Sequence, residues 1–589
     1  MFSYILLFLS SIPLLSKGKN FKLDSQLYAL LLTSALFAYS ILGFISIEII
    51  YFNRSRFPIF YISILIFLLT IFFNKSSFNT YIKIKNFLIS EINNFKKAFE
   101  FQQQKNLVIL ICFLLVSITI SSIGPINHPD SLDYHVGYPY QYWLKGKFFI
   151  DGGFHQALMG SGDYANLAFI QEKTLWFIRY LQISSLPLIT LFLINKLKNK
   201  LYIIAFLSSS TFIQWSTIGK PLFLGEASCA IAYIIWKEYK DNFSSKLLLI
   251  CIISCFSIKI SSLIVCTPIL IDLIINKFLI EKNNFLKDKI YSLKEIFFEK
   301  TIFLSLSLLL TILFLRFKII GNFAFPLMTN IFNKNDIHLI NFTNFLSGYK
   351  RDGAFPLNIF LPTSFSDIAS SLGPGIFLIF LFLIIKTFNP INLKKNVLFY
   401  VCLSQILLLI LFCQGRADYY AMPVIIAIYF SDNLNFIYKN KFLRLPLILS
   451  IYFQVFLIIG FLFFSIKQNV SAINNYKEAM ISSSYGYDFS RLINNKISGN
   501  FYQNVIRDPR YFYPKNYIAR EEMQKCLKDN EQNLCLKKYN IGQIITSKDF
   551  LLNKENYNCE TKYFMSGSRN PFNRKDRYAE VCEKINLIK

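Results

Sequence analysis

Long apolar runs separated by short polar connections dominate the chain between residues 2 and 465. Many runs have roughly 16 to 25 residues, the length that an α-helix needs to cross a bilayer. We expect about 13 to 14 membrane-spanning helices, near residues 2–16, 26–50, 57–74, 107–123, 175–195, 201–218, 221–236, 246–258, 260–275, 301–317, 371–386, 396–412, 418–431 and 443–465. The pattern therefore predicts a mostly α-helical, polytopic membrane protein. Met1–Leu15 is interpreted as a retained span, because no basic region precedes it and no small-residue cleavage site follows it.

The chain becomes polar and charged after about residue 465, with short apolar patches such as Ile541–Thr546 and a helix-like stretch at Ala519–Leu527. This pattern predicts a small α/β domain over residues 466–589. Its cysteines are even in number and favour two disulfides in an oxidising compartment, with three pairings open among Cys526, Cys535, Cys559 and Cys582. The remaining cysteines lie in or beside expected spans and are interpreted as small apolar packing residues: Cys112, Cys229, Cys251, Cys255, Cys266, Cys402 and Cys413.

Composition supports a membrane protein. A mean hydropathy of +0.41, 54% hydrophobic residues and 63 phenylalanines exceed what a soluble core absorbs. The net charge of +27 would suit a nucleic-acid partner, but the lysines lie in short clusters between apolar runs rather than on one face. We therefore expect contact with a lipid bilayer and no binding of nucleic acid.

The lysine clusters also predict the topology, because cytoplasmic connections carry an excess of basic residues. Every second connection contains such a cluster: Lys17/Lys19/Lys22, Lys83/Lys85/Lys96/Lys97/Lys105, Lys196/Lys198/Lys200, Lys277/Lys282/Lys287/Lys289/Lys294 and Lys439/Lys441/Arg444. The alternate connections then face the outside, namely 124–170, 318–370 and the turns near Lys220, Lys259 and Arg416. The C-terminal domain shares that side.

The membrane part divides into two regions. Residues 1–105 form extra N-terminal spans and a segment at 76–104, which has the helical spacing of an amphipathic helix on the cytoplasmic face or is a plain connector. Residues 106–465 form the main module. Lys259 interrupts an apolar stretch that could be one long helix, which would invert the downstream topology, but the lysine clusters favour two spans.

Polar side chains that could carry chemistry gather on the predicted outer side. The loop after the 107–123 span contains Asp130, Asp133, His135 and Asp163, and later connections contain cations. A carboxylate can activate a hydroxyl, and cations can hold a phosphate. The cations expected to act in this way are Lys220, Lys259, Arg351 and Arg416.

Several of these motifs resemble the outer loops of the GT-C superfamily of integral-membrane glycosyltransferases. The elements are Asp130–His135 with Pro139 and Trp143–Lys147, the "G-K-P" turn of Ile218–Pro221, the "S-x-K" turn of Ser257–Ser261, and the late element Gln414–Pro423. The resemblance covers residues 106–430 and is closest to the polyprenyl-phosphate-sugar-dependent, protein mannosyltransferase or aminoarabinose transferase type. The three spans before the Asp130 loop depart from the usual single span, and Arg-Ala-Asp-Tyr stands where the family has Arg-Tyr.

The resemblance implies a GT-C-like helical bundle that transfers a hexose or pentose to a lipid, glycan or protein acceptor during cell-envelope glycan biosynthesis. Asp130 would be the catalytic carboxylate, supported by Asp133 and His135. Tyr134 and the cations would bind the donor and its phosphate: Lys220, Lys259, Arg351 and Arg416. The resemblance implies no definite cofactor, and a divalent metal ion at Asp130 and Asp163 stays open. The expected location is the bacterial inner membrane, with the site on the periplasmic side.

Other interpretations remain open from the sequence. Asp130 and Asp133 could form a solvated loop pair, and Lys220 and Lys259 could mark span ends by snorkelling. The histidines could bind a metal, but their spacing matches no helical ligand pattern. A flippase of lipid-linked sugars would need polar residues through the bilayer, and a polysaccharide polymerase or ligase would need outer arginines. Glu226 lies within a span and is expected to pair with a cation inside the bundle.

Overall fold

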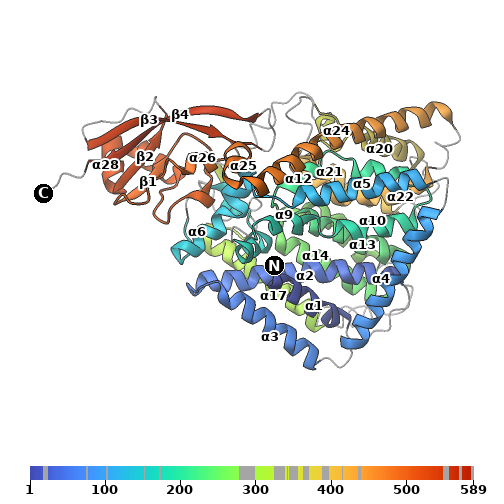
Figure 1. Ribbon diagram of the computed structural model, residues 1–589. Coiled ribbons are helices and arrows are strands. Elements are labelled where there is room, and N and C mark those ends of the chain that lie inside the picture. The colour runs from blue at the N-terminus through green and yellow to red at the C-terminus, as the bar shows by residue number, and fades with distance from the viewer. Residues whose placement is uncertain are drawn as a thin grey trace.

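The computed structural model shows a mostly helical protein with a small mixed sheet near its C-terminus (Figure 1). It describes residues 1–16, 24–73, 77–100, 104–150, 153–170, 174–276, 299–323, 325, 339–340, 343, 356–362, 371–387, 397–413, 416–434, 440–547, 556–568 and 573–585. The statements below concern these residues.

Helices lie in every range that was expected to span the membrane. They are α1 (Phe2–Ser16), α2 (Asp24–Tyr51), α3 (Phe57–Phe73), α5 (Lys105–Ser122), α9 (Trp176–Ile183), α10 (Leu186–Lys196), α11 (Leu201–Leu207), α12 (Phe212–Thr217), α13 (Phe223–Tyr239), α14 (Asn242–Ile258), α15 (Leu263–Ile275), α17 (Lys300–Ile320), α20 (Pro374–Thr387), α21 (Val397–Cys413), α22 (Ala421–Phe430) and α24 (Lys441–Asn474). The connections hold α4 (Ser77–Glu100), η1 (Ser131–His135), α6 (Gly137–Lys145), α7 (Phe154–Ala157), α8 (Ser161–Ala165), η2 (Asn166–Phe169), η3 (Ile260–Ser262), η5 (Leu357–Ile359), η8 (Ala417–Tyr419) and η9 (Ser431–Asn433).

Within the described chain, 5 helical segments are long and apolar enough to cross a membrane, or up to 6 if the bent pair of α3 and α4 is one span. These segments are Asp24–Tyr51, Lys105–Ser122, Trp176–Lys196, Lys300–Ile320 and Lys441–Asn474. Several other apolar helices have only 10–17 residues. The protein is thus a helical membrane protein by the length and composition of its helices, and the full count of 13 to 14 spans stays a prediction.

The chain reverses direction at Lys259. Cys255, near the end of α14, lies against Gly225 at the start of α13, where an added Cβ would come within 2.9 Å of the Cys255 sulfur. Asp272, near the end of α15, instead pairs with Lys237 near the end of α13 (Nζ–Oδ2 2.5 Å). Therefore α15 runs back along the direction opposite to α14, and the two are separate helices, as the lysine clusters indicated.

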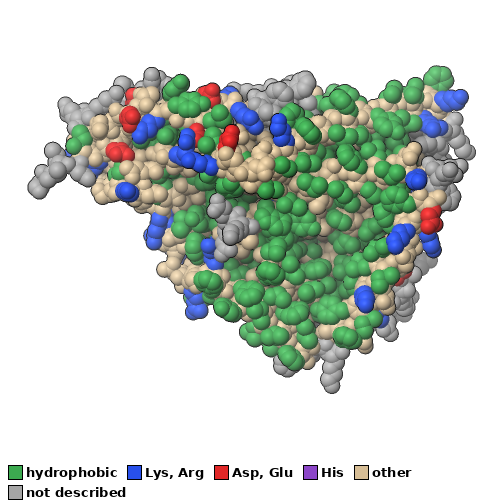
Figure 2. All heavy atoms as spheres, viewed as in Figure 1, with side chains coloured by type: hydrophobic (Ala, Val, Ile, Leu, Met, Phe, Trp, Pro, Cys, Tyr) green, Lys and Arg blue, Asp and Glu red, His purple; other side chains and the backbone are tan. Residues whose placement is uncertain are grey.

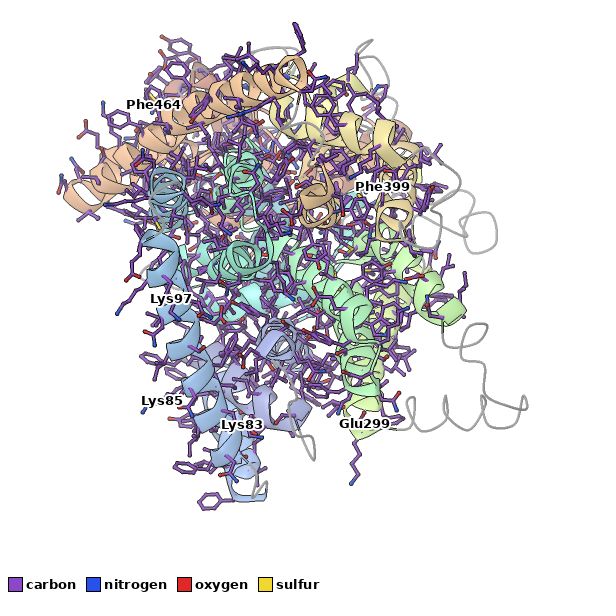
Figure 3. All side chains as sticks on the ribbon, turned by 90° about the vertical axis from the view of Figure 1, so that its right-hand side faces the viewer. Lys83, Lys85, Lys97, Glu299, Phe399 and Phe464 are labelled. Atoms are coloured by element: carbon purple, nitrogen blue, oxygen red, sulfur yellow. A yellow bond between two sulfur atoms is a disulfide. The ribbon has the colours of Figure 1, made fainter. Side chains whose placement is uncertain are left out.

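The helices form a bundle with polar ends. Figure 1 shows the C-terminal sheet at one end and α4 lying across the other. The face between them is mostly hydrophobic in Figure 2, with lysines and arginines near both ends. In Figure 3, which looks onto the α4 end, Lys83, Lys85 and Lys97 follow this helix, while Ile84 and Phe87 are buried beneath it. The separation of charged ends from an apolar belt matches the two surfaces of a bilayer.

The C-terminal domain follows α24, which continues past the predicted domain boundary at residue 466 and ends at Asn474. Its elements are α25 (Tyr476–Ser483), α26 (Tyr487–Ser490), β1 (Asn500–Gln503), η10 (Arg510–Phe512), α27 (Arg520–Asp529), α28 (Gln532–Lys538), β2 (Ile541–Thr546), β3 (Tyr557–Ser566) and β4 (Lys575–Lys584). The sheet has the order β1-β2-β4-β3, with β1 parallel to β2 and the other pairs antiparallel. Successive residues of a strand face opposite sides, so Ile544 and Ile545 of β2 enter two separate cores.

The two disulfides expected in this domain are present. Cys526 of α27 is bonded to Cys535 of α28, and Cys559 of β3 is bonded to Cys582 of β4. Of the three possible pairings, the fold selects the one that joins adjacent elements. The first bond closes the helical pair that covers one side of the sheet, and the second ties neighbouring strands together.

Candidate active site

The outer loop that carries Asp130 and Asp133 contains a π-helical turn, η1. The Gly219 N–H donates to the hydroxyl of Ser131 within this turn (3.1 Å). This bond holds the short connection before α13 against the outer loop. Lys220, which follows Gly219, is thereby brought to the same end of the bundle as the two aspartates.

Asp130 lies at the centre of a charged cluster. Its Oδ1 accepts from Nη1 of Arg507 (2.6 Å), and its Oδ2 accepts from the hydroxyl of Tyr134 (3.0 Å). Arg416 approaches the same Oδ2 (3.8 Å). The ring of His155 stacks on Tyr134 with 4.0 Å between centroids, and its Nε2 lies 3.2 Å from Arg507. Two cations and two rings therefore surround this carboxylate.

Asp133 holds the C-terminal domain to the membrane part. Its carboxylate forms an ion pair with Arg510 and lies 3.3 Å from Nε of Arg507. Arg510 is also 3.4 Å from Glu521, and its guanidinium lies over the Tyr138 ring, 4.5 Å from the centroid. Both arginines come from the C-terminal domain, so this domain completes the ionic environment of the outer loop.

Two of the expected phosphate-binding cations share one carboxylate. Lys220 donates to Oδ2 of Asp418 (2.5 Å), and Arg416 lies 3.3 Å from the same atom. Lys220 also lies over the ring of Tyr419, 3.7 Å from its centroid. The late Arg-Ala-Asp-Tyr element thus supplies Arg416 to Asp130 and a counter-charge to Lys220.

Lys259 belongs to a second group next to the first. It lies 3.4 Å from Oδ2 of Asp163, whose Oδ1 is hydrogen bonded to Nδ1 of His135 (2.6 Å). The Gly160 N–H also donates to Asp163 (2.9 Å). Only glycine fits at this position, because a Cβ on Gly160 would lie 2.2 Å from the carbonyl oxygen of Ile258. This close approach brings Asp163 to the end of α14, where Lys259 begins the turn.

The pKa values of Asp130 and Asp133 are shifted in opposite directions. Burial raises the pKa of Asp130, but Arg507, His128 and Arg416 outweigh burial and hold this pKa well below its usual range. At Asp133, burial raises the pKa more than its two arginine partners lower it. Asp130 is therefore a stable anion and a weak base while Arg507 is in place.

His135 and His155 are both neutral at pH 7. Burial is the main cause that lowers the pKa of His135 to about 4, with Lys259 acting in the same direction and Asp163 opposing it. Burial, followed by Arg507, places the pKa of His155 well below its usual range. Neither imidazole adds positive charge to the site at this pH.

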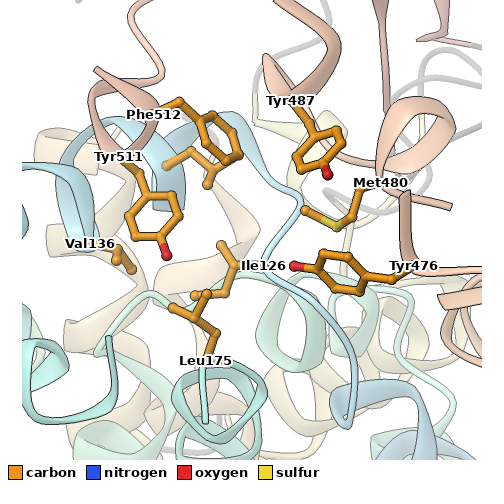
Figure 4. Close-up of a pocket in the computed structure, with 9 residues that line it drawn as sticks. Ile126, Val136, Leu175, Tyr476, Met480, Tyr487, Tyr511 and Phe512 are labelled. Atoms are coloured by element: carbon orange, nitrogen blue, oxygen red, sulfur yellow. The ribbon is translucent and has the colours of Figure 1, made fainter. Parts of the chain in front are cut away.

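An aromatic pocket of about 210 Å³ adjoins η1. Figure 4 shows the hydroxyl groups of Tyr476 and Tyr511 turned toward the space between them. The lining residues come from the outer loop, the start of α9 and the C-terminal domain: Ile126, Leu132, Val136, Leu175, Tyr476, Met480, Tyr487, Tyr511 and Phe512. The charged residues do not line this pocket and pack against one another instead.

The structure brings most of the expected site residues together. One connected set of ion pairs, hydrogen bonds and ring contacts contains Asp130, Asp133, Tyr134, His135, Asp163, Lys220, Lys259 and Arg416. Arg351 lies outside the described residues. Arg507 and Arg510 were not expected, and the signal that could have indicated them is the Arg-Asp-Pro-Arg sequence in a domain that faces the same side.

Asp130 and Asp163, the carboxylates considered for a metal ion, already have partners. Arginines surround Asp130, and Asp163 has Lys259 and the neutral imidazole of His135 beside it. In the part of the chain that the structure describes, the one group of three or more closely spaced metal-ligand side chains is formed by cysteines of the bundle.

Comparison of the chain with protein-family models, with curated proteins and with solved structures found no match.

Proposed function

We propose that this chain is a GT-C-like membrane glycosyltransferase that transfers a sugar from a polyprenyl-phosphate-linked donor to an acceptor on the extracytoplasmic side. The observation that carries the proposal is the convergence of Asp130 with Arg416, 3.8 Å away, and with Lys220 through the shared Asp418. These residues lie in connections far apart in the sequence. A carboxylate beside several cations fits a reaction in which a hydroxyl is activated and a phosphate leaves.

The proposed reaction is a single displacement at the anomeric carbon. Asp130 accepts the proton of an acceptor hydroxyl, whose oxygen forms a bond to the anomeric carbon while the bond from that carbon to the phosphate oxygen breaks. Polyprenyl phosphate leaves with the electron pair, and Arg416, Lys220 and Lys259 neutralise it. Low-dielectric surroundings strengthen each of these interactions.

Arg507 would couple donor binding to activation of Asp130. Among the nearby charges, Arg507 contributes most to lowering the pKa of Asp130. Its side chain is nevertheless 41% exposed and lies at the accessible edge of the cluster. A donor phosphate competes for Arg507 with the aspartates. When Arg507 turns to the phosphate, the pKa of Asp130 rises and the carboxylate becomes a better base.

The proposed location is the inner membrane of a bacterium, with the site and C-terminal domain in the periplasm. Two disulfides in that domain fit an oxidising compartment. The lysines of α4 at the opposite end fit a cytoplasmic surface. The aromatic pocket beside η1 offers a place for a lipid, glycan or protein acceptor.

The test is transfer from polyprenyl-phosphate-linked hexoses and pentoses labelled in the sugar, with the purified full chain in vesicles. Asp130→Asn is expected to lower transfer at least ~100-fold, the usual scale of general-base catalysis. Asp432→Asn is the control, because Asp432 accepts from the Lys198 N–H outside the cluster. Full transfer by a folded Asp130→Asn protein would refute the mechanism. Labelled lipid that crosses the vesicle membrane with its sugar–phosphate bond intact would show a flippase instead.

A further inference from the structure

Three cysteines from three different helices meet inside the bundle. They are Cys229 of α13, Cys255 of α14 and Cys266 of α15, and their sulfur atoms all lie within 4.8 Å of one another. Each is at most 1% exposed. Isolated buried cysteines act as small apolar side chains, as the sequence indicated, but three that converge from separate helices form a set of soft ligands.

The spacing of these sulfur atoms is close to that of a metal site. A tetrahedral zinc ion with Zn–S bonds of about 2.3 Å separates its sulfur ligands by roughly 3.8 Å. Shifts of no more than about 1 Å would therefore close the observed triangle around an ion. The helices already approach closely, because α13 has Gly225 where it faces Cys255 (2.9 Å from an added Cβ to the sulfur).

Glu226 is the second, independent observation. It is fully buried (0% exposed), and apart from a weak contact with the Met422 backbone, neither carboxylate oxygen has a hydrogen-bond partner among the described residues. Three positions before Cys229 on the same helix, it lies on the same helical face. Its carboxylate is close enough to Cys255 and Cys266 to interact electrostatically with both. A buried intramembrane acid whose oxygens lack hydrogen-bond partners is costly, and a bound cation would stabilise it.

We propose that Cys229, Cys255, Cys266 and Glu226 bind a structural zinc ion. Thiolates and a carboxylate are ordinary zinc ligands, and a rotation of the Glu226 side chain toward the three sulfur atoms would complete a closed tetrahedral site. The thiols release their protons when the ion binds. Glu226 and Cys266 lie in the first turns of α13 and α15, where the helix dipole favours negative charge.

The zinc ion would tie together the helices that carry the cationic turns. Cys255 is one helical turn before Lys259, while Glu226 and Cys229 are in the first turns after Lys220. Cross-linking α13, α14 and α15 at this depth fixes the separation of the two lysines. This role does not depend on the proposed glycosyl transfer, and it would hold for any function of the outer cluster.

The experiment is elemental analysis of the full chain purified in detergent without chelators. About one zinc per chain is expected, with loss of most of it in Cys255→Ser and retention in Cys402→Ser, whose cysteine is equally buried but lies in α21. Glu226→Gln should lose zinc to a competing chelator at least tenfold faster than the unmodified protein. Zinc that Glu226→Gln retains unchanged would overturn the role of Glu226.

A second measurement keeps the proposal testable if a variant does not fold. Cobalt added to the unmodified protein after removal of zinc should produce the absorption of thiolate-to-cobalt charge transfer, saturating at about one ion per chain. Absence of zinc together with absence of this absorption would overturn the site. A disulfide between two of the three cysteines, detected by mass after alkylation of the unfolded chain, would also overturn it.

Discussion

Replacing Arg510 by glutamine should loosen the junction between the C-terminal domain and the membrane part. Arg510 is 3% exposed and pairs with Asp133, which is 5% exposed in its side chain. Glutamine removes the charge and leaves the carboxylate of Asp133 buried with only Arg507 nearby. The domain can then relieve the penalty by separating from the outer loop, where Asp133 meets water.

The magnitude follows from the burial of the pair. Breaking a buried ion pair by removing one partner costs about 3 to 5 kcal/mol. We take the lower end, about 3 kcal/mol, because Arg507 still lies 3.3 Å from Asp133 but is too exposed to replace Arg510 fully. This corresponds to a roughly 150-fold larger population of the separated state. Burial raises the pKa of Asp133 more than the arginines lower it, so the charged carboxylate is unfavourable in this position. The double variant Asp133→Asn/Arg510→Gln removes both charges and should therefore restore most of the docking.

Amide hydrogen exchange at Tyr485 measures the separation directly, because its N–H donates to the carbonyl oxygen of Asn127 across the junction (3.1 Å). Exchange should accelerate by about two orders of magnitude in Arg510→Gln and much less in the double variant. The control is Arg491→Gln, which removes an exposed arginine paired within the C-terminal domain. Exchange within threefold of the unmodified protein, or a double variant looser than Arg510→Gln, would refute the reasoning.

The penalty in Arg510→Gln should also depend on pH. A carboxyl whose folded pKa is raised favours the folded state below that pKa and loses this contribution as the pH rises through it. Protonated Asp133 needs no partner charge, so the variant should dock better at acid pH. Exchange at Tyr485 measured across pH, and corrected for the intrinsic exchange rate, should therefore approach the unmodified value on acidification. A variant that loosens further as the pH falls would contradict the assignment of the buried charge to Asp133.

Three further outcomes are expected. Arg507→Gln should raise the pKa of Asp130, because Arg507 contributes most to lowering that pKa. Asp130 then becomes protonated at a higher pH, so the acid limb of the pH–rate profile of sugar transfer should move to higher pH. An acid limb that does not move would contradict the coupling between Arg507 and Asp130. His135→Asn should reduce the loss of thermal stability that occurs as the pH falls from 6.5 to about 4. In this range the unfolded chain binds a proton that folded His135, with its lowered pKa, does not bind, which costs up to about 3 kcal/mol of stability. A melting temperature that depends on pH as steeply in the variant as in the unmodified protein would show that His135 is not the cause. Replacing Cys559 and Cys582 by serine should destabilise the C-terminal domain by about 3 kcal/mol, because the disulfide closes a loop of 23 residues in the unfolded chain. Urea unfolding followed by proteolysis measures this loss. An unchanged urea midpoint would mean that the disulfide does not form.

The helices were predictable because each apolar run contains few charged residues and ends at a polar connection. The turn at Lys259 illustrates the strength of this signal, since one lysine in an apolar stretch, read with the positive-inside rule, indicated two helices. The strands were weaker signals. Ile541–Thr546 was evident as an apolar patch and forms β2, but nothing local indicated that β1 would pair with it in parallel.

The sequence predicted on which side of the membrane the site residues lie, but not which of them pair with one another. Sidedness placed Asp130, Lys220, Lys259 and Arg416 together, because connections on one side meet at one end of a bundle. Pairing depends on distances that the sequence does not contain. Arg507 was missed for this reason, since it lies more than 370 positions away from Asp130 and belongs to a separate domain.

The ionic cluster as it stands is closed, and this has a mechanistic consequence. Lys220 and Arg416 are bonded to Asp418, and Arg507 is bonded to Asp130, so a donor phosphate gains little from meeting them unless it replaces carboxylates as their partner. Such an exchange trades one charge-assisted hydrogen bond for another and leaves the net charge of the cations satisfied throughout. In the proposed transfer, the carboxylate released first would be Asp130, because its partner Arg507 is the most exposed cation of the set. Donor binding and activation of Asp130 would then be one event in the proposed mechanism, and no reactive base would be present before the donor arrives.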